Sequence, residues 1–366
     1  PTYPELCCHS LSDLDIIDGR DKIRFAVADD VRAVYAQDVI PFWGGKSIRD
    51  IMFSHMTGEW KTAYEAGVFT EFMEQRAPGH TVLDGKIYGH GLRDFISRID
   101  GKLAGMDQLS DPRAFDKREQ LTAMRIAAEA VIRSAERHAE LADQMAAAEP
   151  DPSRRAELLR IASNCRHVPA FAPRDFWEAL QAYWFVHLGV ITELNTWDSF
   201  CPGRLDQHLN PFYQAGLQGG ALTEAQAREL LACFWVKFNN QPAPPKVGVT
   251  AAESGTYTDF CNINSGGLTP EGADGVNDVT YLVLDTIDEM RILQPSSNIQ
   301  LSARNPDRFL KRAAEIVRKG WGQPSIFNAD VVVEELLRQG KSLEDARCGG
   351  TSGCVEVGAF GKEAYI

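Results

Sequence analysis

The sequence contains no long apolar run. No stretch approaches the roughly 18 uninterrupted apolar residues of a membrane-spanning helix, and the N-terminal end lacks a basic region followed by an apolar segment. Internal repeats and low-complexity linkers are also missing. We therefore expect no membrane partner, no secretory signal peptide and a cytoplasmic location.

Positive charge is scarce. The chain has 38 Lys and Arg residues against 51 Asp and Glu residues, so its formal net charge at pH 7 is −13. Binding to nucleic acid depends on cationic side chains that release counterions from the phosphates. The charge balance therefore argues against a nucleic-acid partner.

Cysteine pairs of the form CxxC do not occur among the eight cysteines. Zinc sites and secreted disulfide frameworks depend on closely spaced or regularly paired thiols. We therefore expect reduced thiols and no bound metal.

Apolar residues make up 44% of the 366 residues, which is enough for a large buried core. At about 150 residues per domain, the length fits two domains or one large domain such as a barrel. Helical patterns cover 121–149, a second run to 164 after Asp151-Pro152, and a largely apolar segment over 175–189. The first two predict an antiparallel helix pair, and the third predicts a helix buried on most of its faces.

Further along the chain, short apolar segments alternate with helical ones. A capping box at 223–226 predicts a helix to 239, and Asn305-Pro306 predicts a cap and a first-turn proline for a helix to 319. Strand-like segments lie at 247–250, 260–264, 298–301 and 325–327. Short strands separated by helices favour an α/β fold with a barrel-like core.

The segment 347–358 gathers four glycines around Cys354 and Glu356. Glycines on both sides of Cys354 allow a tight turn that presents its side chain at a loop tip. In an extended chain, Glu356 would lie on the same side as Cys354. A neighbouring carboxylate raises the pKa of a thiol, so this pair suits a thiol that donates and accepts a hydrogen atom better than an ionic nucleophile. From this segment alone, a buried inert cysteine in a glycine-rich loop is an equally good interpretation.

This loop and several other motifs resemble those of glycyl radical enzymes. The thiyl-loop signature of that family is similar to Gly353-Cys-Val-Glu356. Pyruvate formate-lyase has two adjacent cysteines at this loop, whereas Val355 and Glu356 follow Cys354 here, as in the dehydratase and C–X lyase branch. Other similar segments lie at 1–5, 69–80, 192–198, 202–208, 237–242 and 361–365. The resemblance covers essentially the whole chain.

The resemblance implies a β/α barrel of ten strands in two antiparallel halves of five, surrounded by helices, with the cysteine loop and a glycyl loop at its centre. It also implies a homodimer and a protein-based glycyl radical, made by a separate radical activating enzyme that uses S-adenosylmethionine and an iron–sulfur cluster. The family's Arg-Val-x-Gly loop is missing from this sequence. We therefore expect residues 1–366 to be the N-terminal and central part of the catalytic domain, with the cysteine loop at 348–358, an incomplete barrel and no turnover by this fragment alone.

Within the family, the chain most resembles the trans-4-hydroxy-L-proline dehydratases, which implies a small-molecule substrate that loses water to give 1-pyrroline-5-carboxylate. Cys354 would abstract the hydrogen from the ring carbon next to nitrogen. Glu356 would manage the proton on the hydroxyl-bearing side, and His80 would donate to the departing hydroxyl. These three are the implied catalytic residues.

The same resemblance implies four substrate-binding residues. Asp198 would hold the protonated ring amine, and Ser254 would hold the carboxylate together with backbone N–H groups. Phe72 would form the apolar wall against the ring, and Asp259 would support the polar network. Each of them, like His80, also has an ordinary structural alternative as a cap, a turn residue, a loop contact or a core side chain.

Other functions stay open. Isethionate sulfite-lyase is the nearest competitor, although Asp198 would repel a sulfonate if both faced one cavity, and choline lyase and the diol and glycerol dehydratases are weaker alternatives. A truncated, inactive paralogue that binds a small molecule is a different class. An ionic thiol enzyme is another, and it predicts alkylation of Cys354 at neutral pH without activation. Asp206 and His208 are interpreted as a structural polar cluster.

Overall fold

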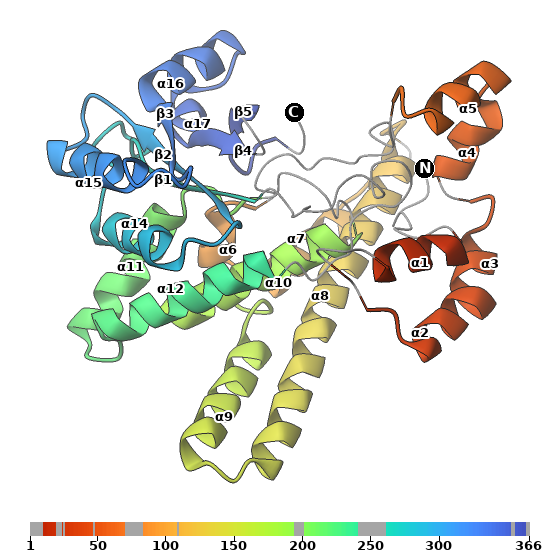
Figure 1. Ribbon diagram of the computed structural model, residues 1–366, viewed down its shortest axis with the longest axis horizontal. Helices are drawn as coiled ribbons and strands as arrows, with labels where there is room; N and C mark the ends of the chain where they lie inside the picture. The colour runs from red at the N-terminus through yellow and green to blue at the C-terminus, as the bar shows by residue number, and fades with distance from the viewer. Residues whose placement is uncertain are drawn as a thin grey trace.

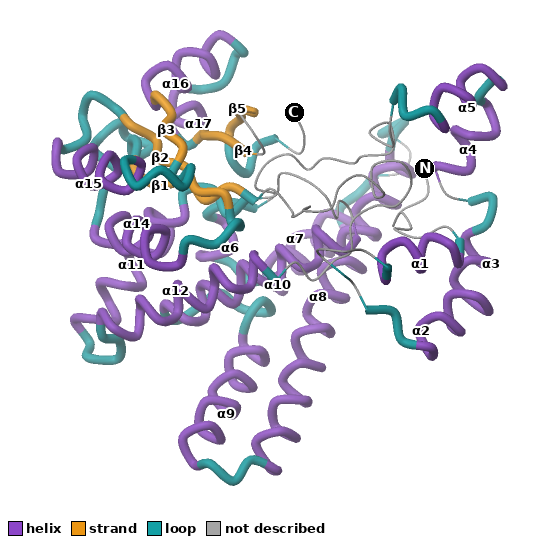
Figure 2. The backbone as a smooth tube through the Cα atoms, viewed as in Figure 1, coloured by secondary structure: helices purple, strands orange, loops and turns teal. Residues whose placement is uncertain are grey.

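The computed structural model describes residues 10–19, 24, 26–46, 48–69, 83–107, 110–193, 201–240, 261–352 and 356–363. Within these residues helices dominate and the strands are short (Figures 1 and 2). No helix in the described ranges is both long enough and apolar enough to cross a membrane.

Short helices make up the N-terminal part of the described chain. Their bounds are α1 Leu11–Asp18, α2 Asp29–Val34, a π-helical segment η1 Tyr35–Val39, α3 Ile40–Trp43, α4 Ile48–His55, α5 Gly58–Glu65, α6 Lys86–Gly89 and α7 Leu92–Ala104. In Figure 1, α1 to α5 lie at the right and the strands lie at the left. Helices α1 to α5 thus lie apart from the sheet, whereas Lys86 of α6 donates to the Gly361 carbonyl, just after strand β5 (Glu356–Ala359), at 2.9 Å.

The predicted antiparallel helix pair is confirmed as α8 (Ala114–Ala148) and α9 (Pro152–His167), which project from the body of the molecule (Figure 1). Asp151 caps α9 by accepting a hydrogen bond from the Ser153 N–H at 3.0 Å. α8 begins seven residues earlier than predicted, because residues 114–120 are mostly good helix formers as well. Small side chains line the contact between the two helices, among them Ala135, Ala139, Ala142 and Ala162.

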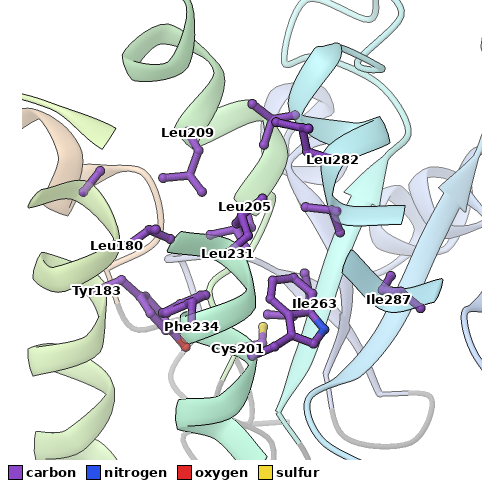
Figure 3. Close-up of a cluster of buried hydrophobic side chains, with 14 of the residues drawn as sticks. Leu180, Tyr183, Cys201, Leu205, Leu209, Leu231, Phe234, Ile263, Leu282 and Ile287 are labelled. Atoms are coloured by element: carbon purple, nitrogen blue, oxygen red, sulfur yellow. The ribbon is translucent and has the colours of Figure 1, made fainter. Parts of the chain in front are cut away.

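Three longer helices form the middle of the molecule. They are α10 Phe176–Glu193, α11 Leu205–Gln218 and α12 Glu224–Asn239. The predicted burial of α10 is confirmed, since Leu180 and Tyr183 lie in the main apolar cluster with Leu231 and Phe234 of α12 (Figure 3). The predicted capping box of α12 is also confirmed, with Thr223 N–H donating to Gln226 Oε1 at 2.9 Å.

Three parallel strands form the sheet, in the order β1-β2-β3. A helix follows each strand along the chain: β1 Asn262–Gly266 and α14 Asp278–Met290, β2 Ser296–Leu301 and α15 Asp307–Val317, β3 Ser325–Asn328 and α16 Ala329–Arg338. A parallel bridge between Arg204 and Asn264 places the segment before α11 beside β1. Parallel strands that are each followed by a helix are the pattern of a β/α barrel wall, and this single bridge holds the start of α11 against the side of β1 that faces away from β2.

A two-stranded antiparallel hairpin completes the described chain. It consists of β4 Gly349–Ser352 and β5 Glu356–Ala359, and α17 Leu343–Arg347 precedes it. Ser342 caps α17 by accepting the Asp345 N–H at 3.1 Å. Figure 1 shows the hairpin next to the sheet.

Three of the four predicted strands are confirmed, with shifted ends because pairing across the sheet sets the register. The fourth, 247–250, lies outside the described residues. The predicted Asn305 cap of α15 is wrong: Pro306 occupies the cap position, and the Asn305 amide donates instead to the Gly267 carbonyl at 2.8 Å. α15 also ends at Val317 rather than at 319.

Candidate active site

The two faces of the sheet differ in chemistry. Ile263 of β1 and Ile299 of β2 lie in the main apolar cluster with the helices. Asn264 and Asn298 are partners in register, so their side chains share the other face of the sheet. Their exposed fractions are 0% and 3%. Because buried amides require hydrogen-bond partners, this face must be covered by polar groups.

The hairpin supplies those partners through Thr351. The Asn264 side-chain amide donates to the Thr351 carbonyl at 2.8 Å, and the Thr351 N–H donates to Asn264 Oδ1 at 3.3 Å. Asn298 Nδ2 donates to the Thr351 hydroxyl at 2.8 Å, and that hydroxyl donates to Asn264 Oδ1 at 3.3 Å. Gln300 adds a bond from Nε2 to Asn264 Oδ1 at 2.9 Å. We call Asn264, Asn298, Gln300 and Thr351 the amide network.

Two glycines allow β4 to lie this close to the sheet. A Cβ atom on Gly350 would lie 2.7 Å from the Phe360 ring and 2.9 Å from Asn264 Oδ1. One on Gly349 would lie 2.3 Å from Leu336 Cδ1. Glycine is therefore required at both positions for close packing, a different role from the flexible turn that the sequence suggests for this segment.

Arg204 fixes the beginning of the same hairpin. Its guanidinium group is buried and donates to the carbonyl oxygens of Gly349 at 2.7 Å, Arg347 at 3.1 Å and Gly266 at 2.8 Å. Burial lowers the pKa of Arg204, and the nearby Asp206 opposes this shift. A planar guanidinium can bond several carbonyls at once, which an ammonium group cannot match. Arg204 thus ties the end of β1 to the start of β4.

Asp206 supports the same junction from the first turn of α11. Its carboxylate accepts hydrogen bonds from the Gly266 N–H at 2.7 Å and from the Thr280 hydroxyl at 2.6 Å. Burial raises the pKa of Asp206, and these two hydrogen bonds oppose the rise. The side chain therefore connects α11, β1 and α14.

His208 pairs with Asp84, and its Nε2 lies 2.8 Å from Asp84 Oδ1. Burial by itself would raise the pKa of Asp84, but the charge and hydrogen bond of His208, together with the Gly85 N–H and the charge of Arg204, outweigh burial and lower it. Tyr88 stacks on the imidazole with ring centroids 5.2 Å apart. Together with the contacts of Asp206, this confirms the predicted structural polar cluster.

Glu356 is the predicted site residue that lies within the described part of the chain. It is the first residue of β5, half-buried, and it pairs in register with Ser352, the last residue of β4. Residues directly opposite each other in an antiparallel pair project on the same face. Ser352 is fully buried, and its hydroxyl has no hydrogen-bond partner among the described residues. A buried polar hydroxyl and a carboxylate therefore share one face at the end of the hairpin.

The other predicted site residues lie outside the described ranges, and their roles stay predictions. They are Cys354, His80, Phe72, Asp198, Ser254 and Asp259. Cys354 is the middle one of the three residues that join β4 to β5 along the chain. The described ends of that connection, Ser352 and Glu356, are paired.

The segment 347–358 contains Cys348 as well as Cys354. Burial, with a smaller contribution from Asp84, raises the pKa of the Cys348 thiol to about 11. Cys348 therefore stays protonated at neutral pH and is not a candidate ionic nucleophile.

Sequence reasoning missed the amide network. A signal was present, because Asn-Ile-Asn at 262–264 and Asn-Ile-Gln at 298–300 alternate polar and apolar residues. Strands of a parallel sheet are normally buried on both faces and mostly apolar. Amides at alternate positions in two such strands point to a polar partner on one face.

A large groove in the described structure lies elsewhere. It measures about 870 Å³ between α9, α10 and α12 and is lined by Arg160, Trp177, Trp184, Leu230 and Phe234 among others. No residue of the hairpin lines it. Across the described ranges, no group of three or more His, Cys, Asp or Glu side chains is arranged to hold a metal ion.

Known proteins resemble this chain over its full length. A curated trans-4-hydroxy-L-proline dehydratase from Clostridioides difficile is 55% identical over 366 residues, which cover 100% of this chain and 46% of the relative. The isethionate sulfite-lyase of Desulfovibrio desulfuricans is 34% identical over 349 residues, covering 92% of this chain and 42% of the relative. The chain thus spans about half the length of the curated relatives it matches.

Solved structures agree. The crystal structure of hydroxyproline dehydratase from Clostridioides difficile, with trans-4-hydroxy-L-proline bound, superposes with a TM-score of 0.91 at 55% identity, covering 100% of this chain and 46% of that one. The expected fold class, an incomplete α/β barrel of the glycyl radical enzyme type, is confirmed by these matches. The pyruvate formate lyase-like family model matches residues 1–366, and the chain belongs to that family.

Proposed function

We propose that this chain carries the cysteine loop of a glycyl radical C–O lyase that dehydrates trans-4-hydroxy-L-proline to 1-pyrroline-5-carboxylate. The observation that carries the proposal is the 55% identity over all 366 residues to a dehydratase of that name. The isethionate sulfite-lyase is 34% identical, and the chain resembles it less. The paired Ser352 and Glu356 support the proposal, because they flank Cys354 in the sequence and place a buried hydroxyl and a half-buried carboxylate opposite each other.

In this proposal Cys354 moves a hydrogen atom in both directions. As a thiyl it takes one hydrogen atom from the ring carbon next to nitrogen, so an S–H bond forms as the C–H bond breaks. The hydroxyl leaves as water with one proton, and the ring nitrogen releases one proton. The hydrogen atom then returns from sulfur to the carbon that lost the hydroxyl. The net change is the loss of one water molecule, and Cys354 is a thiyl radical again at the end.

The other residues bind the substrate and manage protons. Glu356 handles the proton on the hydroxyl-bearing side, and His80 donates to the departing hydroxyl. Asp198 holds the ring amine and Ser254 holds the carboxylate. A buried Asp198 carboxylate is tolerable because the protonated amine of the substrate brings the opposite charge.

Phe72 and Asp259 complete the proposed pocket, Phe72 as an apolar wall and Asp259 as support for the polar groups. A glycyl radical outside residues 1–366, made by an activating enzyme that uses S-adenosylmethionine and an iron–sulfur cluster, would supply the unpaired electron. Residues 1–366 would then be the N-terminal and central part of the catalytic domain, with the cysteine loop at 348–358. A homodimer and a cytoplasmic location stay predictions.

An anaerobic assay tests this function. The intact protein that contains this chain is activated, its glycyl radical is counted by electron paramagnetic resonance, and hydroxyproline and isethionate are supplied separately. We expect 1-pyrroline-5-carboxylate from hydroxyproline, and no product from Cys354→Ser with an undiminished radical signal. Turnover of isethionate but not of hydroxyproline would reject the proposal. A protein that carries no radical after activation would support an inactive paralogue.

A further inference from the structure

Three polar groups of Thr351 form hydrogen bonds with side chains of the sheet. Its carbonyl accepts from Asn264, its N–H donates to Asn264, and its hydroxyl accepts from Asn298. None of these residues belongs to the substrate-binding or catalytic set proposed above. The network is nevertheless costly to build, because each buried amide must be desolvated and a well-packed apolar face would be at least as stable. Directional hydrogen bonds fix the position of Thr351 more closely than apolar packing would, and this explains why buried polar groups occupy this face of the sheet.

Thr351 lies close to the connection between β4 and β5. It lies one residue before the end of β4, and only three residues separate β4 from β5. A connection of three residues can span few different paths. The positions of Ser352 and Glu356 at its two ends therefore limit where residues 353–355 can lie. The Arg204 clamp on Gly349 holds the other end of the same strand. β4 is thus fixed at both ends by buried side chains from the barrel wall.

We propose that the amide network is a positioning device for the cysteine loop, in which Thr351, Asn264 and Asn298 set the rate of hydrogen-atom transfer and not the affinity for substrate. The inference rests on the proposed function. Transfer of an atom requires near contact, and a displacement of about 1 Å costs on the order of 100-fold in rate. The proposed binding residues 72, 198, 254 and 259 lie on other segments of the chain, so we expect a displacement of β4 to change kcat rather than KM.

A pair of threonine variants tests the inference in the activated intact protein. Thr351→Val keeps the shape of the side chain but removes the hydroxyl that bonds Asn298 and Asn264, and Thr351→Ser keeps that hydroxyl. Thr286→Val is the matched control, since Thr286 is also buried and, among the described residues, its hydroxyl donates to the Leu282 carbonyl within its own helix α14. We expect Thr351→Val to lower kcat about 10- to 100-fold at unchanged KM and radical content. Thr351→Ser restores kcat, and Thr286→Val leaves it unchanged.

A second readout requires no substrate. In the unactivated protein, alkylation of Cys354 is followed by peptide mass spectrometry against Cys233, an exposed cysteine on α12. We expect Thr351→Val to change the Cys354 to Cys233 rate ratio at least fivefold, and Thr286→Val to leave it unchanged. Asn298→Ala, which removes the donor to the Thr351 hydroxyl, is expected to act in the same direction if Thr351→Val does not fold.

The outcomes separate the two proposals. Failure of the wild-type protein to dehydrate hydroxyproline would overturn the proposed function, while a changed alkylation ratio would still support the positioning role. A raised KM at unchanged kcat, or an alkylation ratio within twofold of wild type in both Thr351→Val and Asn298→Ala, would overturn the positioning role itself.

Discussion

Arg204 and Gly349 are 145 positions apart in the sequence and are joined by two hydrogen bonds, since Nε and Nη2 of Arg204 both donate to the Gly349 carbonyl oxygen, at 3.1 and 2.7 Å. The same guanidinium reaches the Gly266 carbonyl at the end of β1. One buried cation therefore connects the wall of the barrel to the strand that leads into the cysteine loop. Its loss would remove the Arg204 donors from the carbonyls of Gly349, Arg347 and Gly266, of which Gly266 would keep the bond from Gln207 Nε2 at 3.0 Å.

Replacement of this cation by a smaller one tests the connection. Arg204→Lys keeps the charge but cannot bond three carbonyls in the same geometry, so we expect a loss of about 2–4 kcal/mol in the free energy of unfolding. Urea denaturation followed by tryptophan fluorescence measures it. Arg133→Lys, on the exposed face of α8, is the control and should change stability by less than about 0.5 kcal/mol. Equal effects of the two variants would contradict the buried clamp.

Gly350 should tolerate no side chain. Its Cβ would meet the Phe360 ring at 2.7 Å and Asn264 Oδ1 at 2.9 Å, so Gly350→Ala is expected to destabilise the protein by about 1–3 kcal/mol. Gly58→Ala at the start of α5 has no atom within 4 Å of the new Cβ and serves as the control. Thermal unfolding measures both. A melting temperature for Gly350→Ala at or above wild type would show that β4 is not closely packed.

The Asp84–His208 pair predicts a dependence of stability on pH. In the folded protein the pKa of Asp84 lies below its ordinary value of 3.8. The pair therefore stabilises the fold fully above that value, and the contribution is lost as the pH falls below 3.8 through the folded pKa.

Asp84→Asn is the variant for this test, because φ at Asp84 is 45° and asparagine also adopts the left-handed region. We expect Asp84→Asn to be less stable than wild type at pH 6, with a smaller difference at pH 3. Denaturant titrations at the two pH values measure it. A difference that stays constant or grows toward pH 3 would contradict the shift.

The chemistry assigned to Cys354 can be probed without radical chemistry. If Glu356 keeps the thiol protonated, iodoacetamide should alkylate Cys354 slowly at pH 7, and Glu356→Gln should raise the rate by up to about tenfold for each unit by which the thiol pKa falls. Peptide mass spectrometry measures the rate, with Cys233 as the internal reference. Rapid alkylation of the wild-type protein would instead favour an ionic thiol enzyme.

Local signals in the sequence predicted local structure well. The capping box at Thr223 and the helix break at Asp151-Pro152 were predicted because the signals are local: Thr223 accepts an N–H three residues away, and Asp151 accepts one two residues away. Asn305 shows the limit of such reasoning. It has the sequence of a cap, but its amide is bound to Gly267, 38 positions away, and a contact of this kind leaves no trace in the neighbouring residues.

In the candidate site too, local features could be predicted from the sequence and contacts between distant segments could not. The segment around Cys354 could be identified from its glycines, thiol and carboxylate, and from its resemblance to a family. The alternating amides of β1 and β2 indicate a polar partner on one face, but they do not identify it. Asn264, Asn298 and Thr351 come from three separate segments and meet only when β1, β2 and β4 are in place. Register across a sheet is a property of the whole fold, and no single segment specifies it.

The dependence of β4 on two neighbouring strands has a consequence for the order of folding. Thr351 can bond Asn264 and Asn298 together only after β1 and β2 have paired, and closing these long loops is slow. During synthesis β1 and β2 precede β4, so they can form a template before the hairpin is made. The hairpin of β4 and β5 would then form late, against two strands that are already paired.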